Sequence, residues 1–338
     1  MKVCVDGRSL VGPGRGVAHY TFALLEALAR AFPDDEWRVV VPRGAARVPA
    51  GVAIRRVDLP GRVVFGTAAL TGRPRLDRLA GGGDVVWLPA VAPVAVSAGV
   101  PLVLTVHDRS WEERPGDFTR YERLWHRLAR PRRLARGAAR VLTTTAVGRR
   151  DLVATWGLDG ARVVAVPLAP AVGVASAARE PAGDPYALFV GALEPRKGPD
   201  VLARAAARAG VRVIAVGDGR VSVPGLEHVG RVSDAELSAL YAGALAVVVP
   251  SWLEGFGLPG VEALVHGTPV IASDLPVLRE VLGDAATFVA PGDEAGLAEA
   301  LREHAERPRR ADPASVAHLR WEATARATRA VLAEAAAA

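Results

Sequence analysis

Short runs of β-branched residues alternate with longer stretches rich in Ala, Leu and Arg along almost the whole chain. Short apolar runs are typical of strands buried on both faces, and the longer stretches have helical spacing. The alternation predicts parallel α/β structure. The predicted strands are 3–5, 37–41, 52–57, 85–88, 102–106, 141–144, 162–166, 187–190, 212–216, 246–249 and 269–272. Helices are predicted at 20–31, 199–209, 234–241 and 258–266.

The alternation stops once, at 167–185, a segment rich in Ala, Pro and Gly. We expect this segment to link an N-terminal domain, 1–166, to a second domain, 186–310. Both domains should be Rossmann-like parallel sheets, facing each other across a cleft. Ligands of such sheets bind beyond the carboxyl ends of the strands. Motifs that directly follow a strand are therefore the first candidates for function.

Composition narrows the class of protein. The chain has 338 residues, enough for two domains with cores of their own. Half of the residues are hydrophobic and 23% are charged, which excludes a disordered chain. The single cysteine, Cys4, excludes a disulfide framework, so we expect a cytoplasmic protein. No window of about 18 apolar residues is free of charge, so no membrane-spanning segment is expected.

The positive charge is concentrated in one segment. The net charge is +6, but residues 109–150 alone hold twelve arginines against four acidic residues. The aromatic residues among these arginines are Trp111, Phe118, Tyr121 and Trp125. A helix over 121–136, interrupted at Pro131, would have a basic face suited to the anionic inner face of a membrane. The alternative is a solvated arginine face with the aromatics packed inside, and nucleic acid is disfavoured because no stacking platform accompanies the charge.

The most informative motif is 250–262, which follows a buried strand and opens the helix 258–266. Its glycines let the backbone approach a ligand closely, and the N–H groups at a helix start favour an anion. Glu254 lies before the helix and Glu262 lies inside it. Two carboxylates would repel phosphate, so hydroxyl groups are their better partners. Phosphates on the backbone and hydroxyls on the carboxylates describe a nucleotide sugar.

Glu254 and Glu262, with seven residues between them, resemble the E-x7-E motif of retaining glycosyltransferases with the GT-B fold. The sequence Glu-Gly-Phe-Gly-Leu-Pro from Glu254 onward strengthens the likeness, and the chain resembles the glycosyltransferase group 1 (family 4) enzymes. The resemblance implies that Glu262 holds the donor ribose and that Glu254 contacts the donor hexose. It further implies that a C-terminal helix, within 311–338, packs back on the N-terminal domain. The backbone implied to line the sugar and phosphate site is that of Gly255, Phe256, Gly257 and Leu258.

A second motif, 191–198, follows the predicted strand 187–190. Arg196 and Lys197 place two cations where a diphosphate leaving group gains negative charge. Lysine is rare in this arginine-rich chain, so its use at 197 favours a compact ammonium that arginine does not replace. Some relatives carry Arg at the position of Ala192, so the diphosphate is expected to depend more on Arg196 and Lys197.

Two candidates lie in the N-terminal half. Gly16 belongs to the glycine-rich loop after the first strand, and the resemblance implies that its backbone N–H meets the donor phosphate. His107 ends a buried strand and matches the family's His-Asp pair. The expected role of His107 is a hydrogen bond to the donor hexose near the reacting carbon.

Together these features predict a metal-independent glycosyltransferase that moves a mannose- or glucose-type hexose from a nucleotide-diphosphate sugar, and the resemblance implies that it is a retaining enzyme. The acceptor would be a hydroxyl of a glycan, a glycolipid or a small molecule. No Asp-x-Asp occurs, which disfavours a metal-held diphosphate, and no cofactor is expected besides the nucleotide sugar as co-substrate. No motif in the sequence identifies the nucleotide base of the donor, so GDP-mannose and UDP- or dTDP-hexoses are all possible donors. The alternatives are a non-catalytic nucleotide-sugar-binding protein and an epimerase or phosphorylase of similar shape.

Overall fold

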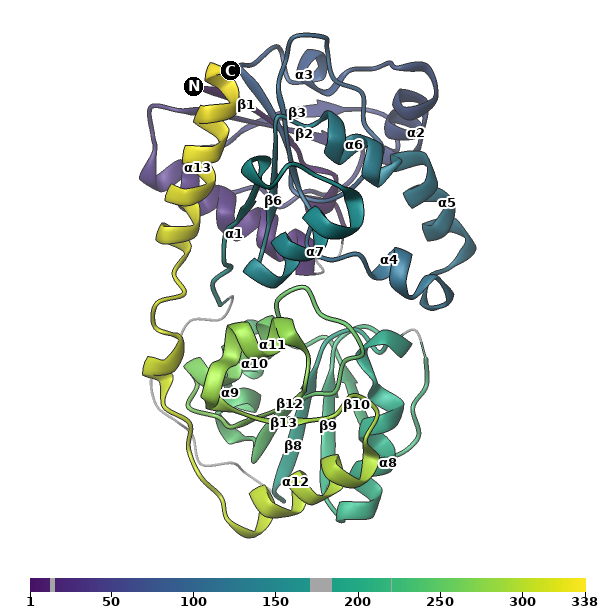
Figure 1. The fold of residues 1–338 in the computed structure, drawn as a ribbon, viewed down its shortest axis with the longest axis vertical. Helices are drawn as coiled ribbons and strands as arrows, with labels where there is room; N and C mark the ends of the chain where they lie inside the picture. The colour runs from purple at the N-terminus through teal and green to yellow at the C-terminus, as the bar shows by residue number, and fades with distance from the viewer. Residues whose placement is uncertain (13–15, 171–183, 220) are drawn as a thin grey trace. The chain divides into compact units, whose positions relative to one another are not determined.

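A computed structural model of the chain describes residues 1–12, 16–170, 184–219 and 221–338. The chain divides into two compact units, each built on one sheet (Figure 1). Unit 1 comprises Met1–Leu168 and Arg320–Ala338, and unit 2 comprises Ala169–Leu319. Most of the predicted linker 167–185 lies outside the described residues.

The sheet of unit 1 has seven parallel strands in the order β3-β2-β1-β4-β5-β6-β7. The inner strands β4 and β5 are entirely buried, which explains why all their residues except Thr105 are apolar. The strands are β1 Lys2–Asp6, β2 Glu36–Pro42, β3 Ala53–Val57, β4 Val85–Leu88, β5 Leu102–Thr105, β6 Arg140–Thr143 and β7 Val163–Ala165. The helices are α1 Gly16–Ala31, α2 Gly61–Thr71, α3 Leu76–Leu79, α4 Ser110–Glu113, α5 Arg120–Ala129, α6 Pro131–Gly137, α7 Ala146–Trp156 and α13 Trp321–Ala337.

Helix α13 belongs to unit 1 although it follows unit 2 along the chain (Figure 1). It packs against α1 and against strands β4, β5 and β6. Arg329 pairs with the buried Asp35 at 2.9 Å, and Thr324 donates a hydrogen bond to the carbonyl of Pro167 at 2.7 Å. The helix begins at Trp321, ten residues after the predicted start of the C-terminal segment at 311. The intervening Pro313–Val316 forms a short 3-10 turn that is part of unit 2.

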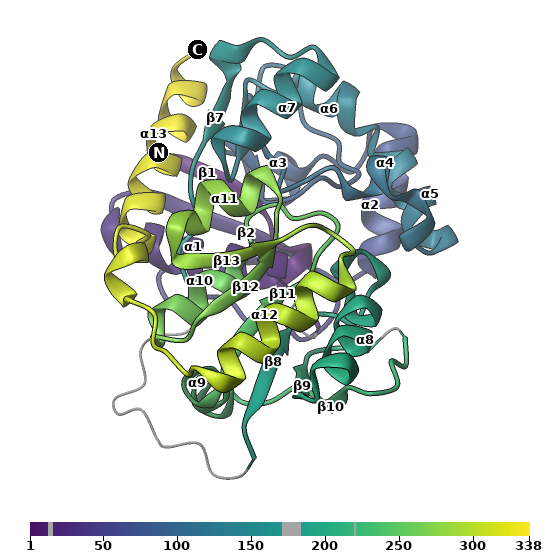
Figure 2. The ribbon, with the colours of Figure 1, turned by 60° about the horizontal axis from the view of Figure 1, so that its bottom comes forward.

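The sheet of unit 2 has six parallel strands in the order β10-β9-β8-β11-β12-β13. Helices α8 and α12 pack together on one face, and α10 packs against α9 and α11 (Figure 2). The strands are β8 Tyr186–Val190, β9 Arg212–Val216, β10 Glu227–Gly230, β11 Ala246–Val249, β12 Val270–Ser273 and β13 Ala286–Val289. The helices are α8 Pro199–Ala209, α9 Asp234–Gly243, α10 Leu258–Val265, α11 Pro276–Leu282 and α12 Glu294–Glu306.

The predicted fold class is confirmed: both units are Rossmann-like α/β units with parallel sheets. The cleft predicted between them stays a prediction. The predicted helix over 121–136 is two helices, α5 and α6, which meet at Arg130. No helix of the described ranges is both long enough and apolar enough to cross a membrane.

Candidate functional site

The strand order of unit 2 reverses between β8 and β11. β8 continues to β9 and β10 on one side, while β11 continues to β12 and β13 on the other. In open α/β sheets, ligands bind beyond the carboxyl ends of the two strands at such a switch point. The loops at this place are 191–198 after β8 and 250–257 after β11. Both candidate motifs of the second half therefore lie together.

The two loops are joined through their backbones. The N–H of Trp252 donates to the carbonyl of Arg196 at 2.9 Å. Gly198 has φ +64°, and a Cβ built on it would lie 2.2 Å from the carbonyl oxygen of Pro250. Only glycine allows the backbones of the two loops to approach so closely in that conformation. This contact fixes the positions of Lys197 and of the residues after Pro250.

Lys197 and Glu254 form an ion pair at this junction. The Nζ of Lys197 lies 2.6 Å from Oε1 of Glu254, and the side chains are 19% and 7% exposed. The same Oε1 accepts a hydrogen bond from the hydroxyl of Ser251 at 2.7 Å. A carboxylate this buried needs a partner charge, because an unpaired buried ion is costly. The two predicted site residues are thus one electrostatic unit.

Arg196 has a separate partner. Its Nε lies 3.0 Å from Oε2 of Glu194, whose side chain is also largely buried. Glu194 precedes the short 3-10 turn Pro195–Lys197 that carries both cations. The pair orients the guanidinium at the edge of the loop, so Arg196 and Lys197 are held by different carboxylates.

Glu262 lies in the second turn of α10 and is 6% exposed. Its Oε2 accepts a hydrogen bond from the hydroxyl of Tyr241 on α9 at 2.6 Å. Burial and the charge of Glu262 raise the pKa of Tyr241 well above its ordinary value, so the phenol stays a donor. His266 stacks on the Tyr241 ring, with 5.2 Å between ring centroids, and donates from Nδ1 to the Glu262 carbonyl at 2.8 Å. Tyr241 therefore fixes the orientation of the Glu262 carboxylate.

The start of α10 has fewer free N–H groups for binding an anion than we predicted for the start of this helix. Pro259 has none, and the N–H groups of Gly260 and Val261 donate back to the carbonyl of Gly257. The N–H of Leu258 is left as the donor for an external acceptor in this first turn. Gly257 has φ +88°, and a Cβ there would lie 2.3 Å from a Leu278 methyl. Phe256 is buried and anchors the loop.

In unit 1, His107 lies just beyond the carboxyl end of β5. Its Nε2 donates to the carbonyl of Pro89 at 2.8 Å, because a carbonyl only accepts. Burial lowers the pKa of His107, so the ring is neutral near pH 7 and its Nδ1 is an acceptor. The ring of Tyr20 meets it edge to face, with centroids 4.6 Å apart. Gly16 is exposed and begins α1, while 13–15, with Gly14 of the predicted loop, lie outside the described residues.

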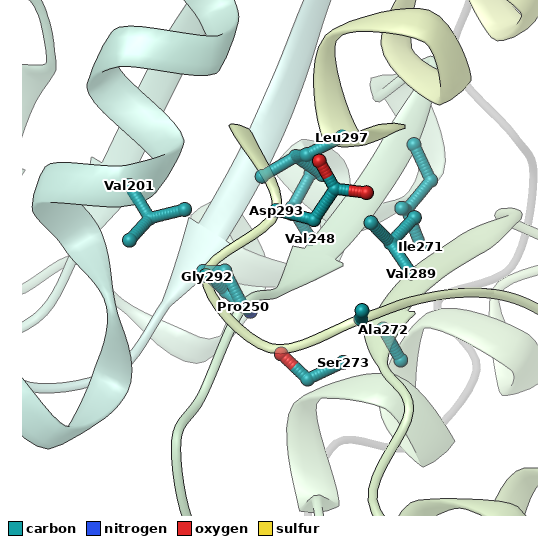
Figure 3. A pocket seen from close by; sticks show the side chains of 11 residues that line it. Val201, Val248, Pro250, Ile271, Ala272, Ser273, Val289, Gly292, Asp293 and Leu297 are labelled. Atoms are coloured by element: carbon teal, nitrogen blue, oxygen red, sulfur yellow. The ribbon is translucent and has the colours of Figure 1, made fainter. Parts of the chain in front are cut away.

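A small pocket lies beside the loop after β11, among Val248, Pro250, Ile271 and Leu297 (Figure 3). Its volume is about 10 Å³, enough for roughly one water molecule. The carboxylate of Asp293, which also lines it, caps α12 by accepting from the N–H groups of Ala295 and Gly296. This pocket is too small for a sugar. Among the described residues, no group of three or more His, Cys, Asp or Glu side chains could hold a metal ion.

Three side chains of the site escape the sequence prediction. Ser251 and Glu194 lie inside the predicted motifs, where their types alone carried no signal of pairing. Tyr241 ends a predicted helix and reaches Glu262 only because α9 packs against α10. Its contact depends on tertiary packing, which no spacing in the sequence reveals.

Two family models match the chain. Residues 184–307 match the model "Glycosyl transferases group 1", and residues 15–169 match the model "Glycosyl transferase 4-like domain". A D-inositol 3-phosphate glycosyltransferase of Segniliparus rotundus is 30% identical over 96% of this chain and 82% of its own length. The O-antigen chain mannosyltransferase RfbU of Salmonella typhimurium is 47% identical, but the match spans 23% of this chain and 22% of that protein.

Solved structures show the same fold. Sucrose-phosphate synthase from Thermosynechococcus elongatus matches 100% of this chain and 96% of its own, with a TM-score of 0.69 and 19% identity. Anabaena HepE, solved in complex with UDP and glucose, matches 98% of this chain and 95% of its own, with a TM-score of 0.63 and 19% identity. With its two family models and a relative matched over nearly the whole chain, the protein belongs to the group 1 glycosyltransferases.

Proposed function

We propose that this glycosyltransferase moves a hexose of the mannose or glucose type from a nucleotide-diphosphate sugar to a hydroxyl of a glycan, lipid-linked or small-molecule acceptor. The observation that carries the proposal is the Lys197–Glu254 pair at the switch point of unit 2, followed along the chain by a second buried carboxylate, Glu262 of α10. A structural neighbour solved with UDP and glucose supports a nucleotide sugar as donor, and relatives named as a mannosyltransferase and as a D-inositol 3-phosphate glycosyltransferase support sugar transfer.

The roles follow from the chemistry of each group. Glu262, oriented by Tyr241, accepts hydrogen bonds from the ribose hydroxyls, and Glu254 accepts from hexose hydroxyls. Arg196, Lys197 and the backbone of Gly255–Leu258 bind the diphosphate. From unit 1, Gly16 offers its N–H to the donor phosphate, and His107 offers its neutral Nδ1 to a hexose hydroxyl. Most of the groups that bind the donor thus belong to unit 2, and we assign the acceptor to unit 1.

We infer a reaction with retention of configuration and without a metal ion. The bond between the anomeric carbon and the phosphate oxygen breaks, and the acceptor oxygen bonds to that carbon from the same face. The acceptor proton passes to an oxygen of the leaving phosphate. Arg196 and Lys197 stabilise the charge that the diphosphate gains, which is the part a divalent cation plays in other enzymes. The single cysteine supports a reducing cytoplasmic compartment.

The test is a thermal-shift panel of GDP-mannose, UDP-glucose and dTDP-glucose, followed by transfer assays with the donor that binds. A donor at about 100 times its Kd is expected to stabilise the protein by about 2.7 kcal/mol. Glu262→Ala should abolish the shift.

Transfer activity should continue in EDTA, because we expect Arg196 and Lys197 to stabilise the diphosphate in place of a metal ion. Loss of activity that magnesium restores would contradict the metal-independent mechanism.

Tyr241→Phe is expected to raise the KM for the donor about tenfold or more while kcat stays within a few-fold. The change removes a hydrogen bond to a buried charged group, an interaction of about 1.5–3 kcal/mol, and ribose contacts are similar in the ground and transition states. Tyr186→Phe is the matched control, because its hydroxyl donates to a backbone carbonyl, that of Leu240, at 2.9 Å. Equal KM values for the two variants would show that Tyr241 only supports the fold.

A further inference from the structure

The carboxylates of the arginine-rich segment 109–150 are already engaged. Glu112 and Glu113 pair with Arg109, at 3.2 and 2.9 Å, and Asp117 pairs with Arg114 at 2.6 Å. Glu122 caps the start of α5 by accepting from the N–H of Thr119 at 2.9 Å. Within the described ranges, five arginines of α5, α6 and their junction form neither an ion pair nor a side-chain hydrogen bond, whereas Arg132 pairs with Glu112 and Arg136 donates to the carbonyl of Trp156. The five are Arg120, Arg123, Arg127, Arg130 and Arg133.

The same region exposes large apolar side chains. Tyr121 and Leu124, one helical turn apart on α5, are 54% and 53% exposed. On α2, Val63 and Leu70 lie two turns apart and are 47% and 73% exposed. Helices α2 and α5 contact each other and lie side by side in both views (Figure 1, Figure 2). We call this surface, formed by α2 and the α5–α6 pair, the α2–α5 face.

The aromatic residues Trp111 and Phe118 of the segment are half-buried, so the alternative of a solvated arginine face with its aromatics packed inside is met only in part. Trp111 stacks on His126 with 4.8 Å between centroids, and Phe118 meets the same ring edge to face. Tyr121 stacks on Trp125, with 6.0 Å between ring centroids, but it stays 54% exposed, and Leu124 beside it is 53% exposed. Since exposing large apolar groups beside unpaired cations gains nothing in water, the face suits a partner that is both apolar and anionic.

A cavity of about 580 Å³ opens beside this face. Its walls are apolar and polar in equal part: Ala69, Val96 and Leu128 are among the lining residues, and Arg130 and Arg133 also line it. Pro101, which precedes β5, lies in its wall, so the cavity is at the amino ends of the strands. His107 follows the carboxyl end of the same strand. The cavity is therefore separate from the candidate site of unit 1.

We propose that the α2–α5 face binds the surface of an anionic lipid bilayer. Leu70, Leu124 and Tyr121 enter the interface between headgroups and acyl chains, where apolar and aromatic side chains are favourable. The unpaired arginines contact anionic headgroups, and Arg130 and Arg133 hold a lipid phosphate at the cavity. The proposal goes beyond the transfer reaction, since it concerns where the enzyme resides and not which bond it makes.

The experiment is co-sedimentation of the full chain with vesicles of phosphatidylcholine containing phosphatidylglycerol, and with vesicles of phosphatidylcholine alone. Binding is expected only to the anionic vesicles. The triple variant Arg123→Ala, Arg127→Ala, Arg133→Ala should bind about 10² times more weakly, since each arginine near a membrane contributes about fivefold, or ~1 kcal/mol. Leu70→Ser combined with Leu124→Ser should weaken binding at least about tenfold with all arginines in place.

The matched control removes three exposed arginines of unit 2, as Arg208→Ala, Arg302→Ala and Arg307→Ala. It has the same net charge as the first triple variant and should bind like the unchanged chain. An equal loss in both triple variants, or equal binding to neutral vesicles, would overturn the proposal. So would a thermal shift with soluble short-chain phosphatidylglycerol in the absence of vesicle binding, because the cavity would then take a single amphiphile and no bilayer. None of these measurements depends on transfer activity. The result on membrane binding can therefore be interpreted even if the proposed transfer reaction is wrong.

Discussion

Lys197→Ala is expected to lower kcat by about 10²–10³, the effect of removing a preorganised charge that stabilises a transition state. The ammonium lies 2.6 Å from Glu254 at the place where we propose that the diphosphate leaves. Lys197→Arg should also be impaired, because the planar guanidinium does not occupy the position of a compact ammonium. The measurement is kcat with the preferred donor, with Tm as the folding control.

The ion pair requires a second comparison. Lys197 could act on the diphosphate, or it could merely neutralise the buried Glu254. In Lys197→Ala the Glu254 carboxylate is left unpaired, and the double variant Lys197→Ala, Glu254→Gln removes that charge. Recovery of kcat in the double variant would show that Lys197 only neutralises Glu254. Arg204→Ala is the matched control, because it removes an exposed cation of α8 that pairs with Asp200 and Glu294. Turnover of Lys197→Ala within about threefold of the unchanged enzyme, ~0.7 kcal/mol, would contradict the catalytic role.

Gly198→Ala is expected to destabilise unit 2 by about 2–5 kcal/mol, roughly 5–15 °C in Tm. The new Cβ would lie 2.2 Å from the Pro250 carbonyl oxygen, in a left-handed conformation with φ +64°. A backbone atom cannot rotate away, so the loops after β8 and β11 must separate. Donor binding should weaken as well, because Lys197 and Glu254 lie on these two loops.

Gly210→Ala provides the control for strain alone. Gly210 has φ +70° and nothing within 4 Å of a built Cβ, so this variant should lose only about 1–2 kcal/mol. Calorimetric unfolding of the two variants separates the cost of the conformation from the cost of the contact. If both variants unfold at the same temperature, the two loops are not held together as closely as the structure has them.

The inner strands of both sheets could be predicted from the sequence because they are buried on both faces. The predicted strands at 85–88 and 246–249 match β4 and β11 residue for residue. Two edge strands, β10 and β13, were not predicted. Glu227–Gly230 is largely exposed and Ala286–Val289 is only half-buried, so neither has the apolar run that burial on both faces imposes.

One part of the candidate site could be predicted from the sequence, and another part could not. Residues 250–262 form one continuous motif, so its chemistry could be read directly from the sequence. The pairing of Lys197 with Glu254 joins residues 57 positions apart, and it depends on β8 and β11 being neighbours. Strand order follows from packing of the whole sheet, which local patterns do not specify. For the same reason, the role of Tyr241 could not be predicted, since it depends on how α9 packs against α10.

The place of α13 in the chain affects how the protein is synthesised. On the ribosome, the first 168 residues of unit 1 emerge long before α13, because residues 169–319 are translated in between. At about 5–20 residues per second, this interval lasts roughly 8–30 s. Throughout it, the surface that will take up the buried Leu332 and Ala335 remains uncovered. The nascent N-terminal unit therefore presents an apolar surface until α13 has been synthesised.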